Sequence, residues 1–330
     1  MAFTTDPETA RFIQQLPKTE THLHIEGALP WKLLQRIDPV KFKDVPESWQ
    51  NDYKFRDFAH FEEQLLGHAF TWYTSPENYH EAAREIFAAH VAANVKYVET
   101  SFASGVIEFL GLNGKEVLSA IVEAAPKDLE LRVFLGIHHN GFNEKMLPII
   151  EDAIGWQKLT GFDLHGTETI PVDPAAVSIW RDARAEGKTT VAHAGEFCGP
   201  DFVRWAIEEL GAQKLRHGIR AVEDPNVVEL IKINNIPLDI CPISNHKLMP
   251  GIQISNHPIR ELYNAGCPVT ISTDDPVSFG NHLNEEYAAL YEHRGFNKEE
   301  LTQVARNGFE TAIADDKTKD EWLGEFTSLA

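Results

Sequence analysis

Two histidines separated by one residue, His22 and His24, lie in a segment near the start of the chain that reads Thr-His-Leu-His-Ile-Glu-Gly. Polar and apolar residues alternate in this segment, which is typical of a β-strand whose alternate side chains face the same side. His22, His24 and Glu26 would therefore share one face. Neutral imidazole is a good ligand for zinc, so both histidines could reach one ion. Alone, the pair is weak evidence, because histidines on strands are commonly ordinary polar residues.

Histidines and carboxylates also follow four later strands that the sequence predicts. These segments are Asp163-Leu164-His165-Gly166, His193-Ala194-Gly195-Glu196, Arg216-His217-Gly218 and Asp274-Asp275-Pro276. In a parallel α/β barrel, the carboxyl ends of all strands meet at one rim, and the active site lies there. We therefore expect these segments and residues 21–27 to gather at one rim.

The donors in these segments match a catalytic zinc site. Such a site uses three imidazoles and one carboxylate, or a similar set, and leaves a position open for water, whose pKa falls toward neutrality. The available donors are His22, His24, His193 and Asp274. We predict that they hold one Zn²⁺ per chain.

Three neighbouring residues could move protons or bind a substrate. Glu196 could carry a proton, while His217 and Asp275 could orient or deprotonate the water or contact the substrate. Each segment also has a structural interpretation. His217-Gly218 could be a strand end before a turn, and Asp274-Asp275-Pro276 could begin a helix. The structural interpretation is favoured for each segment alone, and metal chemistry is favoured for the whole set.

Helices and strands alternate regularly from residue 76 onward. Helices are predicted at residues 76–94, 115–125, 143–156, 174–186, 201–210, 226–233 and 258–264, and the strands that follow them at 95–102, 130–138, 159–164, 189–193, 214–219, 236–241 and 268–273. With the first strand, this makes eight strands. The alternation predicts an α/β protein with a TIM (β/α)₈ barrel, although no repeat of sequence is visible.

Two parts of the chain fall outside this alternation. A short helix is predicted at residues 30–37, and residues 38–74 then form an aromatic-rich segment interrupted by Pro46. We expect a helical insertion there, which either covers a ligand as a flap or packs as a satellite of the core. Satellite packing is favoured for any single aromatic residue. Residues 285–330 predict extra C-terminal helices, and we expect residues 1–330 to form a single barrel domain.

Composition limits the classes of partner and the compartment. The net charge of −20 argues against nucleic acid, because phosphate binding needs an excess of Lys and Arg on at least one face. Hydrophobic residues make up 43%, yet the apolar runs are far shorter than the roughly 20 residues that cross a membrane. Residues 1–17 lack the features of a secretory signal. The three cysteines are widely spaced, which argues against a disulfide framework. We expect a cytoplasmic protein.

Several of these segments together resemble a known family. Residues 21–28, 193–196, 217–218, 241–245 and 272–276 are similar, in the same order, to the motifs of the adenosine deaminase-like branch of the amidohydrolase superfamily. The resemblance spans nearly the whole chain. It implies a TIM-type barrel, one zinc ion, and hydrolytic removal of the 6-amino group from a small-molecule purine.

The resemblance also implies a role for each matching residue. By this resemblance, the metal ligands are His22, His24, His193 and Asp274. Glu196 would be the acid that protonates purine N1, and His217 the base that assists the zinc-bound water. Asp275 would contact N7, and the backbone N–H of Gly166 would donate to N3. Attack at C6 breaks the aromaticity of the ring, so an acid on one side and a metal hydroxide on the other suit this reaction. The cytidine-deaminase type of zinc site needs a C-x-x-C pair, which this sequence lacks.

The substrate stays open between adenosine, adenine and a modified 6-amino purine nucleoside. Family members that act on adenosine typically carry Asp where this chain has Glu26, in the part of the pocket that meets the ribose. Residues 244–248 also resemble the adenine type, whereas residues 216–220 and 272–275 suit the adenosine type. Two rival interpretations are another amidohydrolase reaction and a non-catalytic barrel relative. The complete donor set argues against the second, and the sequence does not predict an oligomeric state.

Overall fold

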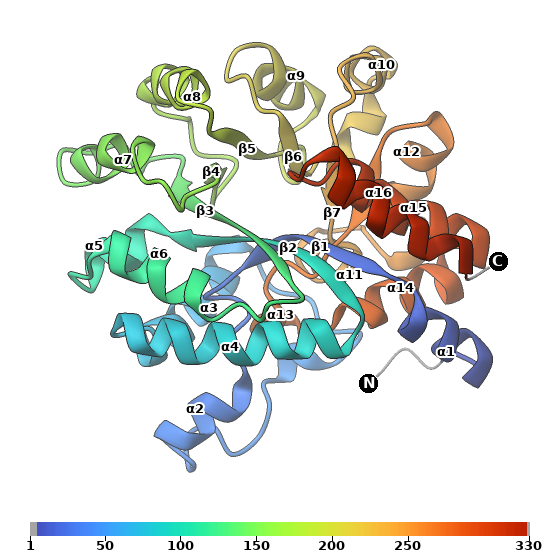
Figure 1. Ribbon diagram of the computed structural model, residues 1–330, viewed down its shortest axis with the longest axis horizontal. Coiled ribbons are helices and arrows are strands. Elements are labelled where there is room, and N and C mark those ends of the chain that lie inside the picture. Colours follow the sequence, from blue (N-terminus) through green and yellow to red (C-terminus); the bar gives the residue numbers. More distant parts are fainter. Residues whose placement is uncertain (1–4, 329–330) are drawn as a thin grey trace.

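The computed structural model describes residues 5–328, which contain an eight-stranded parallel sheet with its strands in chain order (Figure 1). The strands are β1 Lys18–His24, β2 Val95–Ala103, β3 Glu130–His138, β4 Gly161–His165, β5 Thr189–Ala194, β6 Lys214–His217, β7 Leu238–Ile240 and β8 Val269–Ile271. A parallel bridge between Leu23 and Asp274 joins the end of the last strand to the first. The predicted TIM barrel is therefore confirmed.

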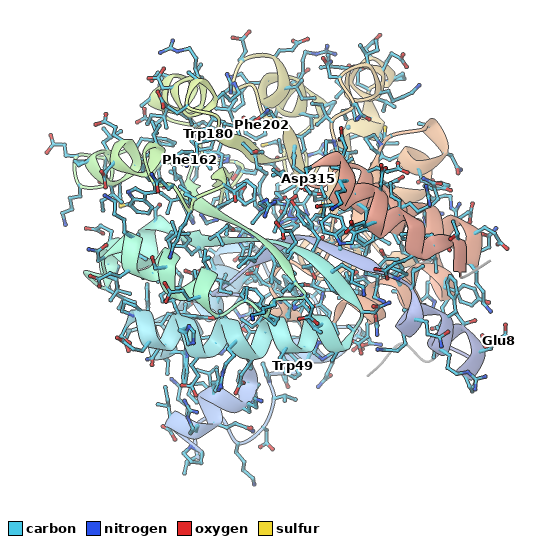
Figure 2. The ribbon with its side chains drawn as sticks, viewed as in Figure 1. Glu8, Trp49, Phe162, Trp180, Phe202 and Asp315 are labelled. Atoms are coloured by element: carbon cyan, nitrogen blue, oxygen red, sulfur yellow. The ribbon has the colours of Figure 1, made fainter. Side chains whose placement is uncertain are left out.

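Helices surround the barrel, with one or more after each strand (Figure 1). They are α2 Trp31–Ile37, α4 Pro76–Ala92, α5 Ser104–Phe109, α6 Gly114–Glu123, α7 Leu147–Ile154, α8 Ala175–Ala185, α9 Pro200–Glu208, α10 Pro225–Ile233 and α12 Ile259–Ala265. Their apolar sides face the strands. Trp180 on α8 and Phe162 on β4, for example, have ring centroids 5.9 Å apart (Figure 2).

The predicted alternation is confirmed, with boundaries that differ by a few residues. Helix α7 begins at Leu147, whereas the sequence predicts a start at residue 143. The side chain of Asn143 accepts hydrogen bonds from the backbone N–H groups of Lys145 and Met146, at 3.1 and 3.2 Å. Asparagine commonly forms such turns, which compete with helical hydrogen bonds.

The insertion after β1 is helical in its second half. Helix α3 spans Phe58–Trp72, and a short 3-10 helix, η1, spans Glu47–Trp49. The side chain of Asp57 caps α3 by accepting the backbone N–H of His60 at 2.8 Å. The buried Lys247 fixes the irregular half, because its ammonium group donates to the carbonyls of Ser48, Gln50 and Phe279.

Three helices follow the barrel, as predicted: α14 Leu283–His293, α15 Lys298–Glu310 and α16 Asp316–Glu325. Helix α15 packs against β1 and β8, and the side-chain amide of Asn307 donates to the carbonyl of Val269 at 2.9 Å. Four helices were not predicted from sequence: α1 Pro7–Gln15, α5 Ser104–Phe109, α11 Pro242–Leu248 and α13 Pro276–Phe279. The assignment of residues 1–330 to one domain stays a prediction.

None of the helices within residues 5–328 is long and apolar enough to cross a membrane, as the composition predicts. Helix α4, the longest of them, has 17 residues. It also carries charged residues such as Glu81, Arg84 and Glu85. The expected cytoplasmic location stays a prediction.

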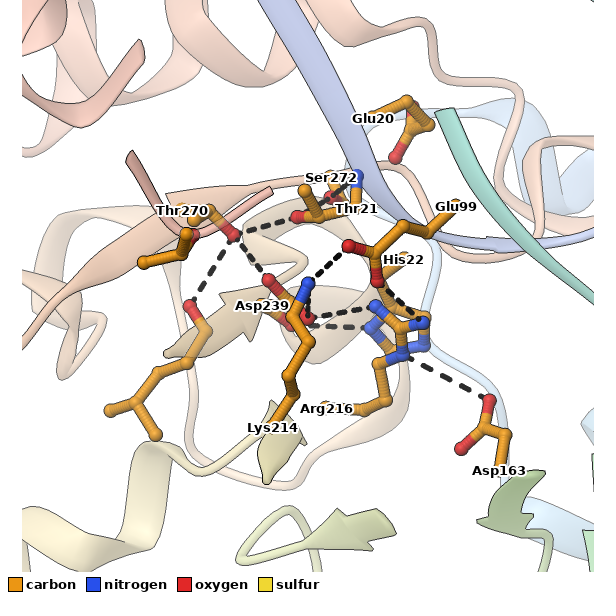
Figure 3. A network of polar contacts seen from close by, with 12 residues as sticks. Glu20, Thr21, His22, Glu99, Asp163, Lys214, Arg216, Asp239, Thr270 and Ser272 are labelled. Carbon is orange, nitrogen blue, oxygen red and sulfur yellow. Dashed lines mark hydrogen bonds and ion pairs between the residues drawn. The ribbon is translucent and has the colours of Figure 1, made fainter. Parts of the chain in front are cut away.

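Charged side chains fill part of the barrel interior (Figure 3). Arg216 donates to Asp239 at 2.7 Å and lies 3.4 Å from Glu99, while Lys214 pairs with the same two carboxylates. All four side chains are buried. TIM-barrel interiors are more commonly filled by branched aliphatic residues. Buried charges persist only where each has a partner, so these residues depend on one another.

We expect Gly308→Ala to lower the free energy of unfolding by about 1–3 kcal/mol, because overpacking has costs of this size. Gly308 lies on α15, and a Cβ atom there would be 1.9 Å from the Thr19 hydroxyl oxygen. Urea denaturation of both proteins measures the change.

The matched control is Gly324→Ala on α16, where a Cβ atom would have no neighbour within 4 Å. Helix propensity predicts that this control gains up to about 1 kcal/mol. Equal stability of Gly308→Ala and the wild type would contradict the close packing of α15 on β1.

Candidate metal centre and active site

The four predicted metal ligands lie together at the carboxyl ends of β1, β5 and β8. The Nε2 atom of His193 is 3.0 Å from that of His22 and 3.2 Å from that of His24. The Oδ1 atom of Asp274 is 3.3 Å from both His22 Nε2 and His24 Nε2. A tetrahedral zinc ion with bonds of about 2.0–2.1 Å keeps its donors about 3.3 Å apart. The donor set therefore fits a zinc ion in both chemistry and spacing.

The other ring nitrogen of each histidine is already engaged. The Nδ1 partners are the Asp239 carbonyl for His22 at 3.1 Å, the Ser101 hydroxyl for His24 at 2.9 Å, and the Asp163 carboxylate for His193 at 3.1 Å. Such partners fix the orientation of a ligating imidazole and leave its Nε2 free for the metal. Asp163 and Asp239 also contact Arg216, so the charged cluster inside the barrel supports the centre.

Two residues of the centre have strained backbones. Asp274 and His217 have φ angles of 65° and 62°, in the left-handed region that non-glycine residues rarely adopt. This strain costs about 1–3 kcal/mol per residue and is typical of functional sites. Asp274 is held by two backbone hydrogen bonds of 3.1 Å, one to the carbonyl of His22 and one from the N–H of His24. Closure of the barrel therefore fixes the position of this carboxylate.

His217, the predicted base, lies beside the four predicted ligands. One donor atom each from His22, His193, His217 and Asp274 lie within 4.8 Å of one another. The Nε2 atom of His217 is 3.9 Å from the Asp274 carboxylate and 3.5 Å from the Glu196 carboxylate. His217 thus lies between the centre and the predicted acid. It is 1% exposed, so only groups in the pocket can reach it.

The predicted acid, Glu196, is buried next to the metal centre. Burial raises its pKa well above the ordinary value, and the nearby Asp274 carboxylate acts in the same direction. A carboxyl group with a raised pKa keeps its proton near neutral pH and can act as a general acid. The side-chain amide of Asn245 donates to one of its oxygens at 3.0 Å.

Glu168, which was not predicted from sequence, holds the loop that carries Glu196. Its carboxylate accepts backbone N–H groups from four consecutive residues, 195–198. This contact joins segments 27 to 30 residues apart, so a local sequence pattern cannot predict it. Glutamate two positions after Gly166 was the only signal available in the sequence.

Asp275 has a buried carboxylate that is available to a ligand. Within residues 5–328, its Oδ1 atom has no hydrogen-bond partner. Burial and the adjacent Asp274 carboxylate raise its pKa well above the ordinary value. A Cβ atom at position 27 would lie 1.6 Å from this oxygen, so Asp275 can occupy its place only because residue 27 is glycine. Buried polar groups normally have partners, so the exception calls for an explanation, such as a ligand.

Glu26 and Gly166 complete the set of predicted site residues. One oxygen of Glu26 accepts the Tyr79 hydroxyl at 2.7 Å and the backbone N–H of Ala103 at 3.1 Å. Gly166 has a φ of 92°, and a Cβ atom there would lie 2.4 Å from the His138 ring. Glycine is therefore required at this position for two reasons. Glu26 and Gly166 both line the same cavity.

This cavity, of about 80 Å³, joins the predicted site residues to the helical insertion. Its polar lining includes His24, Glu196, His217, Asp274 and Asp275. Helix α3 lines it with apolar side chains, which are Phe58, Phe61, Leu65, Leu66 and Ala69. Helix α3 thus lines the cavity, and its role as a flap over a ligand stays a prediction. The satellite packing favoured for single aromatic residues holds for Phe61, which lies in a second, smaller hydrophobic cluster, and for Phe58, which packs against it.

Three further polar side chains line the cavity and were not predicted as site residues: Glu62, His138 and His165. His138 Nε2 lies 3.3 Å from the carboxylate of Glu62, so this pair connects β3 to α3. The His165 ring stacks on that of His24, with centroids 5.4 Å apart. Histidine at the ends of two neighbouring strands was the available signal in the sequence.

Comparisons with known proteins identify the family. The sequence model described as adenosine deaminase matches residues 17–328. The chain belongs to the adenosine deaminase family. The adenine deaminase of Wolinella succinogenes is 30% identical over 329 residues, covering 96% of this chain and 98% of that protein. That of Cupriavidus metallidurans is 29% identical over 333 residues, covering 98% and 94%.

Solved structures show the same fold. The adenine deaminase of Arthrobacter aurescens has a TM-score of 0.85 at 21% identity, covering 95% of this chain and 98% of that one. An amidohydrolase of Burkholderia ambifaria with bound zinc has a TM-score of 0.84 at 22% identity, covering 99% and 94%. Membership of the adenosine deaminase family makes this protein an enzyme that hydrolytically deaminates a 6-aminopurine.

We expect the purified wild type to hold one metal ion per chain and His22→Ala to lose most of it, because the variant removes one of four converging donors. Elemental analysis after gel filtration measures the metal content. His80→Ala is the matched control, since His80 lies on the outer helix α4, where its Nδ1 contacts the Ala120 carbonyl. Equal metal content in wild type and His22→Ala would rule out this ligand assignment.

Proposed function

We propose that this enzyme is a zinc-dependent adenine deaminase, which converts free adenine and water to hypoxanthine and ammonia. One observation carries the proposal. Three of the four donors, those of His24, His193 and Asp274, line a small cavity with the buried carboxyl group of Glu196, and His22 Nε2 lies 3.0 Å from His193 Nε2. Relatives named adenine deaminase, 27–30% identical over nearly the whole chain, support adenine as the substrate.

The four donors would hold the zinc ion through three Nε2 atoms and the Asp274 carboxylate. When bound, zinc acts as a Lewis acid that makes water nucleophilic near neutral pH. Ser101, Asp163 and the Asp239 carbonyl would keep the histidines oriented. The zinc-containing amidohydrolase of similar fold supports this choice of metal.

The residues around the purine would each serve one edge of the ring. Glu196 would protonate N1, so that negative charge does not build on the ring as C6 is attacked. Asp275, whose Oδ1 lacks a partner within residues 5–328, would contact N7, and the backbone N–H of Gly166 would donate to N3. His217 lies between Asp274 and Glu196, and from this position it would form a hydrogen bond with the oxygen that attacks C6.

The size of the cavity supports a free base over a nucleoside. Its volume of about 80 Å³ is far below the roughly 300–1,000 Å³ of sites that hold drug-sized ligands. Glu26 is fixed on one side by Tyr79 and Ala103, and α3 covers the apolar side. A ribose would therefore require α3 to move outward, whereas a single purine base needs less room.

A panel of substrates tests the proposal. Adenine, adenosine, deoxyadenosine and modified 6-amino purine nucleosides are each incubated with the metal-loaded enzyme, and the change of purine absorbance is followed. We expect the highest kcat/KM for adenine. A tenfold preference for a nucleoside would contradict the assignment of adenine. Absence of turnover with every compound would favour another amidohydrolase reaction or a non-catalytic relative.

We expect Glu196→Gln to reduce kcat on the order of a hundredfold or more, because the amide has the same shape but cannot give a proton to N1. Metal content and thermal stability should match those of the wild type. The control is Glu63→Gln on the exposed side of α3. A kcat for Glu196→Gln within a factor of about three of the wild-type value would reduce Glu196 to an orienting role.

We expect Glu26→Asp to raise the ratio of kcat/KM for adenosine over adenine, because the shorter carboxylate makes room beside the purine. One methylene group usually changes discrimination by about 1–3 kcal/mol, so the shift should be moderate. Glu63→Asp serves as the control. If the wild type already prefers adenosine widely and the ratio is unchanged in Glu26→Asp, the pocket is selective through other residues.

A further inference from the structure

Asn245, on helix α11, is fully buried between the two predicted proton-handling residues. Its side-chain nitrogen, Nδ2, lies 3.0 Å from Glu196 Oε1 and 3.1 Å from His217 Nδ1. Asn245 does not line the cavity, so it would act on a substrate only through these two residues. The functions assigned above leave it without a role.

A contact with His257 determines which atoms of the Asn245 amide donate and which accept. The backbone N–H of Ile259 donates to His257 Nδ1 at 3.1 Å, so this nitrogen is an acceptor without a proton. Burial lowers the pKa of His257 to about 3, and the imidazole is therefore neutral at ordinary pH. Its single proton lies on Nε2, which donates to Asn245 Oδ1 at 3.2 Å.

This bond settles which way the Asn245 amide faces. With Oδ1 accepting from His257, the NH₂ group must face Glu196 and His217. Its two hydrogens then meet two acceptors, which uses the full donor capacity of the amide. His217 Nδ1 must accept, so a neutral His217 carries its proton on Nε2, toward the metal centre. Glu196 Oε1 also accepts, which leaves Oε2 as the oxygen that can carry a proton.

We propose that Asn245, oriented by His257, is a positioning residue that holds Glu196 and His217 in complementary hydrogen-bonding states for deamination. The proposal rests on the function proposed above. It gives Glu196 one accepting oxygen and one proton-bearing oxygen. It gives His217 an Nε2–H group directed at the centre before the reaction begins, so that His217 orients the attacking oxygen as a hydrogen-bond donor in this state, in place of the base that the resemblance implies. Loss of the amide lets both side chains rotate within a site that needs them fixed.

The first test compares the wild type with Asn245→Leu, which has a similar size but no hydrogen-bonding groups. We expect kcat with adenine to fall on the order of 10- to 100-fold, with KM within about threefold, because misplacement of catalytic groups has effects of this size. Metal content and melting temperature should be unchanged. A kcat within threefold of the wild-type value would overturn the proposal, and so would a rise in KM with kcat unchanged.

The second test acts at His257, one residue further from the site, and stays informative if Asn245→Leu fails to fold. His257→Gln can still donate to Asn245 Oδ1, whereas His257→Leu cannot. We expect the glutamine variant to keep most of the wild-type kcat and the leucine variant to lose on the order of tenfold. Equal values of kcat for the two variants would overturn the proposed chain of hydrogen bonds from His257 through Asn245 to Glu196 and His217, called the relay below.

A double variant separates the relay from ordinary packing. If His257 acts only through Asn245, adding His257→Leu to Asn245→Leu lowers kcat no further. Multiplied losses in the double variant would mean that the two residues act independently, which would contradict the proposal.

A substrate-free measurement separates failure of this proposal from failure of the proposed function. Long-range ¹H–¹⁵N spectra of protein labelled with ¹⁵N-histidine report which ring nitrogen carries the proton. We expect the proton on Nε2 in both His257 and His217, with His217 assigned through His217→Gln. A proton on Nδ1 of His217 would overturn the relay whatever substrate the enzyme takes. No turnover of any 6-aminopurine, with the expected spectra, would instead reject the proposed function.

Discussion

The pairing of charges inside the barrel is the constraint on which the centre depends. Lys214 and Arg216 neutralise carboxylates that water does not reach, and removing one partner of such a buried pair typically costs about 3–5 kcal/mol. The same carboxylate residues reach the metal centre, since Asp163 contacts the ring of His193 and the Asp239 carbonyl contacts that of His22. The barrel interior thus contains charged residues in place of apolar ones, and the histidines that would hold the metal have fixed orientations.

Backbone strain follows from the same need for fixed geometry. Asp274, three residues after β8, and His217, at the end of β6, adopt left-handed conformations that their side chains disfavour. The strain persists because the bridge between Leu23 and Asp274 also closes the barrel, so relaxation of Asp274 would open the sheet. Stability of the fold and placement of one carboxylate are therefore coupled. Such coupling is the usual origin of a trade-off between stability and activity.

The sequence predicts the parts of this site that local patterns encode. His22 and His24 share a strand face, and the barrel rule brings them to His193 and Asp274 without knowledge of any contact. The contacts of Glu168 with the loop at residues 195–198, and of His257 with Asn245, join separate segments through particular side-chain conformations. The alternating pattern also placed the first strand too late, from residue 21. It begins at Lys18, whose buried ammonium group donates to carbonyls at the end of α1, a contact that composition cannot reveal.

The small cavity beneath α3 has a consequence for the rate of the enzyme. Phe58 and Phe61 line the cavity proposed to hold the purine, and the ammonium group of Lys247 donates to the carbonyls of Ser48, Gln50 and Phe279. If a purine binds in this cavity, as proposed, an outward movement of α3 would widen its path in and out. Such opening takes microseconds to milliseconds and limits turnover in many enzymes. In such an enzyme, the turnover number would measure the motion of α3 and not the breaking of the C–N bond.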